Sequence, residues 1–151
     1  MNGNILNSDA QAVTSLIITG NTVTNFTGLE AFVNVVTLNL GPNPFATVPL
    51  TTLTSLESLQ FTGNDMLNSL DLSQNILLNN LNIQSNTSVI GEAPIVTLNL
   101  ANNINLINLR INRFTNLSNL ILPVTTTLID MEFFYKCNWI FYLNWNDFWW
   151  K

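Results

Sequence analysis

The chain has 151 residues, of which 47% are hydrophobic, and this suits one domain with a sizeable core. Only 9% of the residues are charged, the net charge is −5 and the first basic residue is Arg110, which argues against a surface that binds nucleic acid. With no histidine and one cysteine, Cys137, the chain cannot build a Ser-His-Asp or Cys-His system or an intrachain disulfide.

The first eleven residues are a polar lead-in. They contain no Lys or Arg and no apolar stretch, so they do not have the pattern of a secretory signal peptide. No segment has the composition of a transmembrane helix, because the charge-free stretch at 31–56 contains Asn, Thr and three prolines.

Residues 12–130 repeat the pattern L-x-x-L-x-L-x-x-N, with other apolar residues allowed. Complete copies begin at Val13, Val35, Leu56, Leu67, Leu78 and Ile95, and weaker copies begin at Leu106, Leu117 and Leu128. The unit is about 22 residues long and has two halves of 11 residues. One longer step, from Leu81 to Leu98, contains Gly91 and Pro94 and predicts a loop at 87–94.

Each L-x-L segment alternates inward and outward residues, which predicts a short strand with inward leucines. Two strands per unit form one turn of a flattened coil, and stacked coils share a core. The Asn after each strand can hydrogen-bond backbone groups in the turn and form a ladder. Biased composition does not explain the constant phase, and a helix is disfavoured because Asn and Thr are poor helix formers. We therefore expect an all-β repeat fold of about five coils with short parallel strands.

The segment Leu56–Asn86 resembles the leucine-rich repeat family, in particular the bacterial class with two nested half-repeats. Leu70-Asp71-Leu72-Ser73, followed by Asn75, matches the second half closely. The opening segment, Ala12–Leu40, is similar to the first repeats of secreted or cell-surface bacterial members. The resemblance implies a right-handed leucine-rich-repeat solenoid, an extracellular or cell-surface location, and a binding or adhesion module within a larger protein.

Members of this class often carry a calcium-loop-like stretch before the repeats. Gly3, Ile5 and Asp9 have the spacing of the last part of such a loop, but the earlier acidic ligands are missing and Asp9 replaces the usual Glu. We therefore expect no metal site here. If the likeness is real, the N-terminus is truncated, and the alternative is an ordinary polar lead-in.

The tail, residues 131–151, differs in composition from the repeats. Ten of the fifteen aromatic residues, including all four Trp, fall within 133–150. Three interpretations stay open: a cap over the last coil, an interfacial or partner-binding segment, and a frameshift or gene-fragment artefact. Under the third, the chain is a fragment.

The motifs of nucleotide-binding loops and serine hydrolases are missing from the sequence, and we expect neither a cofactor nor enzymatic activity. A paired acid/base stays open only for Asp130 and Glu132, but they flank an inward position, so both are predicted to point outward to solvent. Outward positions beside the strands are mostly uncharged and polar. The candidate binding residues on this strand face are Ile17, Asn39, Gln60, Asn82 and Arg110.

The leading hypothesis is a non-enzymatic module of a bacterial surface or secreted protein that binds a protein or polysaccharide through this face. The alternatives are a spacer or adhesin stalk without a discrete ligand, a binding module of a larger enzyme, and a surface that only keeps the sheet soluble. An ice-binding array is disfavoured, because Thr19 and Thr62 share a column but Thr37 does not. Uncapped coil ends also predict self-association.

Overall fold

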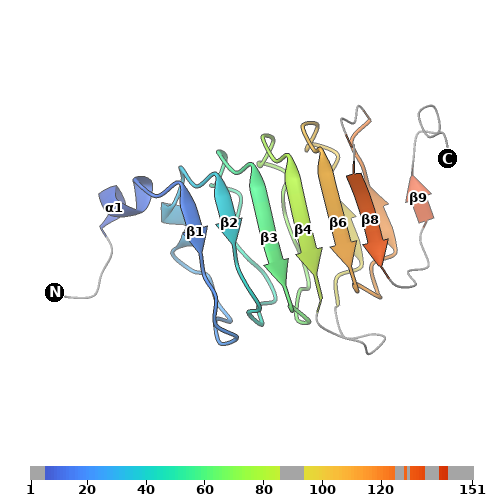
Figure 1. Cartoon of the computed structure of the whole chain (residues 1–151), viewed down its shortest axis with the longest axis horizontal. Coiled ribbons are helices and arrows are strands. Elements are labelled where there is room, and N and C mark those ends of the chain that lie inside the picture. The colour runs from blue at the N-terminus through green and yellow to red at the C-terminus, as the bar shows by residue number, and fades with distance from the viewer. Residues whose placement is uncertain (1–5, 86–93, 125–127, 129, 135–139, 143–151) are drawn as a thin grey trace.

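The computed structural model describes residues 6–85, 94–124, 128, 130–134 and 140–142. The chain runs down the sheet that faces the viewer in Figure 1, returns on the far side and advances towards the C-terminus, which makes a right-handed coil. This confirms the predicted fold class, a parallel-strand β-solenoid. The predictions for Gly3 and Ile5, for most of the loop at 87–94, for Cys137 and for most of the aromatic tail lie outside the described residues.

Sheet A, the larger sheet, has six parallel strands in the order β1-β2-β3-β4-β6-β8. They are β1 (Ser15–Ile17), β2 (Thr37–Asn39), β3 (Ser58–Thr62), β4 (Asn80–Gln84), β6 (Asn108–Asn112) and β8 (Asp130–Phe134). The register follows the sequence period, and the strand leucines Leu16, Leu38, Leu59, Leu81 and Leu109 form one row across the sheet. The longer coil between Leu81 and Leu109 keeps this row intact.

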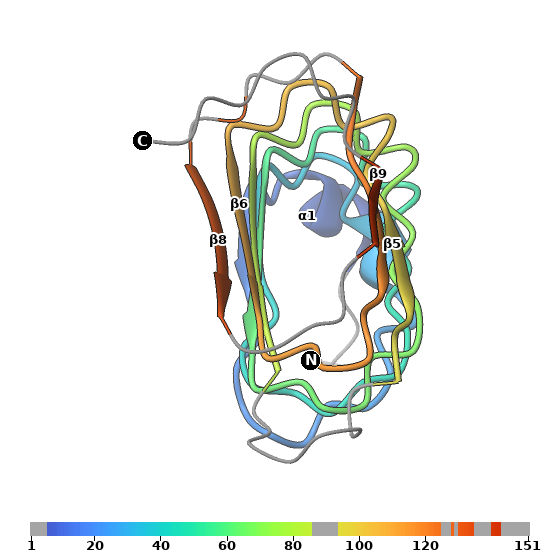
Figure 2. The same ribbon diagram turned by 90° about the vertical axis from the view of Figure 1, so that its right-hand side faces the viewer.

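Sheet B lies on the opposite side of the coil (Figure 2). It contains β5 (Thr97–Asn99), β7 (Asn119–Ile121) and β9 (Ile140–Tyr142), again all parallel. The prediction of two strands in every coil is wrong for the earlier coils, because residues 70–72 form no strand although they match the repeat best. On one side of residues 70–72, the neighbouring coil contains Pro44 and Pro49, which have no N–H to donate. On the other side, no backbone hydrogen bond joins residues 70–72 to β5.

The core runs between the two sides as a continuous column of leucines. Those at the centre, such as Leu59 and Leu81, are fully buried, and each such side chain contributes roughly 1.5–3 kcal/mol to folding. Near the N-terminal end, Phe45 makes edge-to-face contacts with Phe26 and Phe61, with ring centroids 5.1 and 5.4 Å apart.

The first coil is less well covered than the central ones. Its inward residues Leu16 and Ile18 are only partly buried, and with Phe32 they line a recess of about 740 Å³. The short helix α1 (Asn7–Gln11) and the 3₁₀ turn η1 (Leu29–Ala31) contact each other at this end. The lead-in therefore contains a helical turn that the sequence reasoning did not predict.

The predicted ladder is present at four buried asparagines, Asn43, Asn64, Asn75 and Asn103. It joins side chains to backbone rather than side chain to side chain: each Nδ2 donates to a main-chain carbonyl of the preceding coil, at 2.8–3.1 Å. The first member of the series is an exception, because Asn21 is exposed and has a left-handed backbone with φ 65°. The asparagines thus tie successive coils together at the turns.

Candidate binding surface

The five candidate residues lie in a single row across the outer face of sheet A. The strand register pairs Ile17 with Asn39, Asn39 with Gln60, Gln60 with Asn82, and Asn82 with Arg110. Neighbouring strands lie about 4.8 Å apart, so the row is roughly 20 Å long. The structure therefore brings together all the residues that the sequence singled out.

Two parallel rows flank this central row. One contains Ser15, Thr37, Ser58, Asn80 and Asn108, and the other contains Thr62, Gln84 and Asn112. Within the first, Asn80 Nδ2 donates to Ser58 Oγ at 3.0 Å, so part of the surface is held by contacts between coils. From β1 to β6 the outer face of sheet A therefore presents mostly hydroxyl and amide groups, with Ile17 at one end of the central row and Arg110 at the other.

The central row differs along its length in how free its side chains are. Asn39 is committed to the turn after β2, because its Oδ1 accepts the N–H of Gly41 at 2.9 Å. In contrast, the side-chain amides of Gln60 and Asn82 make no hydrogen bond to any of the residues that the structure describes. Gln60 is exposed and Asn82 half-buried, so these two offer free donors and acceptors at the centre of the row.

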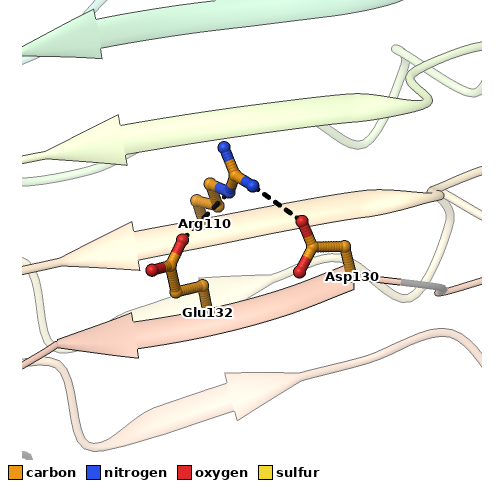
Figure 3. A network of polar contacts seen from close by, with 3 residues as sticks. All are labelled: Arg110, Asp130 and Glu132. Carbon is orange, nitrogen blue, oxygen red and sulfur yellow. Dashed lines mark hydrogen bonds and ion pairs between the residues drawn. The ribbon is translucent and has the colours of Figure 1, made fainter.

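Arg110 is held by two carboxylates from the next strand (Figure 3). Its Nη2 lies 2.8 Å from Asp130 Oδ2, and its Nε lies 3.0 Å from Glu132 Oε2. All three side chains are between 38% and 46% exposed, and surface ion pairs of this kind contribute about 0–1 kcal/mol to stability. Two carboxylates and one guanidinium leave this end of the row with net negative charge.

The sequence reasoning placed Asp130 and Glu132 on the outside, and their partial exposure agrees with that. It missed their contact with Arg110, although the register contains the signal. If Leu109 and Met131 are equivalent, Arg110 and Glu132 must be direct neighbours across the sheet, as they are. One arginine thus binds both carboxylates, and the three side chains form a local ion network on the outer face of sheet A.

Among the described residues, no group of three or more His, Cys, Asp or Glu side chains is placed to hold a metal ion. None of their helices has the length and apolar character needed to cross a membrane.

Comparison with known proteins bears on the fold. No protein-family model and no curated protein matches this sequence, but seven solved chains match the structure. One is the functional domain of InlJ from Listeria monocytogenes, which includes a cysteine ladder; its TM-score is 0.51 at 20% sequence identity, and the match covers 76% of this chain. This chain spans about a third of that one, 31%, and with a single cysteine it has no such ladder. The likeness shows that the chain has the leucine-rich repeat solenoid fold that its sequence resembles.

Proposed function

We propose that the chain is a non-enzymatic interaction module of a bacterial surface or secreted protein, and that the outer face of sheet A binds a partner protein. The observation that carries the proposal is the central row, in which the free amides of Gln60 and Asn82 lie in the middle of an unbroken parallel sheet. The likeness to the InlJ domain supports a solenoid of the kind that presents such a face.

The chemistry of the row favours a polypeptide over a polysaccharide. One end presents Ile17, an apolar side chain that is 65% exposed, and the other presents the ion network around Arg110. A polypeptide offers apolar, amide and charged groups within a short distance, whereas a neutral polysaccharide has no counterpart for the charged end. A basic side chain of the partner would lie next to Asp130 and Glu132.

The test is a binding screen of the purified chain against arrays of surface proteins and glycans, followed by affinity measurements on any protein found. The double variant Gln60→Ala/Asn82→Ala should weaken binding about tenfold, since each lost hydrogen bond costs roughly 0.5–1.5 kcal/mol. The matched control is Asn68→Ala/Gln74→Ala, which removes the same two amide types from exposed positions outside sheet A.

Equal affinities for the two double variants would show that this face is not the binding site. A screen in which only glycans bind would replace the protein with a polysaccharide as the partner. If nothing binds, the result would contradict the binding proposal and favour the spacer.

A further inference from the structure

A cleft lies on the sheet B side of the solenoid, where the backbone ladder between two coils is interrupted. Residues 69–73 of one coil line it on one wall, and β5 with the turn that follows lines it on the other. The structure describes both walls, and no backbone hydrogen bond joins residues 69–72 to residues 97–99. The ladder that β5 forms with β7 is therefore not continued on its other edge, and a cavity of about 260 Å³ remains there.

The two walls are tied together at both ends of the cleft. At one end the N–H of Ile95 donates to the carbonyl of Leu67 at 2.9 Å. At the other, the side-chain amides of Asn102 and Asn103 donate to the carbonyls of Ser73 and Leu72, each at 3.1 Å. These bonds fix the distance between the two coils, so the cleft is pre-formed. They also block both ends of the cleft, so an extended peptide cannot lie in it along the strands.

Most of the residues that line the cleft have polar side chains, although their carbon atoms make up the larger part of the exposed wall. Apart from Leu70, the side chains are three hydroxyls, two amides and one carboxylate: Ser69, Ser73, Thr97, Asn99, Asn102 and Asp71. Asp71 Oδ1 accepts the N–H of Ser73 at 3.0 Å on one wall, and Asn99 Oδ1 accepts the N–H of Ala101 at 3.0 Å on the other. The Ser73 hydroxyl also bonds to the Asp71 carboxylate. The groups left for a ligand are the amide NH₂ of Asn99 and the hydroxyls of Ser69 and Thr97, which can both donate and accept.

We propose that this cleft binds a single sugar ring, a compact neutral ligand rich in hydroxyl groups. An anion is disfavoured, because the lining contains one carboxylate and no basic side chain. A bare cation would leave most of the cavity unfilled, since a water-sized particle needs only about 30 Å³, and a calcium ion prefers more carboxylate ligands than this lining offers. A purely apolar ligand would leave the hydroxyl and amide groups of the walls without hydrogen bonds. A sugar ring carries hydroxyls around its edge and C–H groups on its faces, so it matches both the polar groups and the apolar part of the walls.

The experiment is a titration of the whole chain with D-glucose, D-galactose, D-mannose and N-acetyl-D-glucosamine, followed by amide NMR, with calcium chloride titrated separately. We expect saturable shifts at millimolar concentration of at least one sugar, confined to the amides of residues 69–73 and 97–102. Asp71→Asn and Thr97→Val each remove a polar contact at an exposed position and should weaken this binding about tenfold. Thr51→Val, at an exposed threonine outside the cleft, is the matched control and should change nothing.

Any of four results would overturn the proposal: no saturable shift with any of the four sugars, the same shifts produced by calcium chloride alone, unchanged binding in both cleft variants, or shifts confined to sheet A. The two binding surfaces lie on opposite sides of the solenoid, so failure here does not touch the protein-binding face, and failure there does not touch the cleft.

Discussion

The two sides of this solenoid are built from the same leucine spacing, yet only one carries an unbroken sheet. On the sheet A side every coil contributes a strand, from β1 to β8. On the sheet B side the ladder starts only at β5, and residues 70–72 remain outside it. Inward leucines are therefore sufficient to form a coil, but a ladder also needs neighbours that have N–H groups and lie at bonding distance.

The difference also separates two kinds of surface. The sheet A side presents rows of polar side chains at a constant spacing, which suits an extended contact with another protein. The sheet B side presents the bounded cleft around Asp71, where two coils are tied only at the ends. The interruption of the ladder thus leaves a recess between two coils on the sheet B side.

The largest expected effect is a loss of stability when a core leucine is truncated, and it should differ between the two sides of the solenoid. Leu81 lies in β4 and is fully buried, whereas Leu70 lies in the segment without a ladder and is 7% exposed. We expect Leu81→Ala to lower the free energy of unfolding by about 4 kcal/mol and Leu70→Ala by about 2, because an unladdered segment can collapse further into the cavity left behind. Urea denaturation measures both. Equal losses would mean that the ladder does not affect the rigidity of the core.

The second expected effect concerns the asparagine ladder that ties the coils on the sheet B side. Asn103 is fully buried, and its Nδ2 donates to the carbonyls of Leu72 and Asn75 at 3.1 and 2.9 Å. Asn103→Ala removes two buried hydrogen bonds, although each carbonyl keeps a backbone donor, the N–H of Asn75 or of Leu78, and should cost about 1–3 kcal/mol. Asn102→Ala is the adjacent control: this exposed side chain makes one bond, to the Ser73 carbonyl, and its loss should cost less than about 1 kcal/mol. A cost for Asn103→Ala no greater than for its neighbour would contradict the structural role of the ladder.

The contrast between the sheet A and sheet B sides also explains which features could be predicted from the sequence. The period alone predicted the row that joins Ile17 to Arg110, because a strict repeat gives every strand of sheet A the same register. The period did not predict that residues 70–72 would form no strand. Inward leucines indicate which side chains are buried, but not whether a neighbouring coil is close enough for backbone hydrogen bonds. The cleft follows from that spacing and was therefore missed as well. The helical turn α1 was missed because five residues are too few to show a helical period.

The smallest expected effect is a dependence of stability on pH at Asp71. The hydrogen bonds from the backbone and then the side chain of Ser73 lower the pKa of this carboxyl below its ordinary value of 3.8. Because the folded pKa lies below the unfolded one, the contribution to stability is complete above the unfolded pKa and is lost as the pH falls through the folded pKa. The melting temperature of the wild type should therefore exceed that of Asp71→Asn slightly at neutral pH, and the gap should close in acid. Ser73→Ala keeps the backbone bond and should close only part of the gap, whereas a gap that persists unchanged in strong acid would show that the ionised carboxylate is not its source.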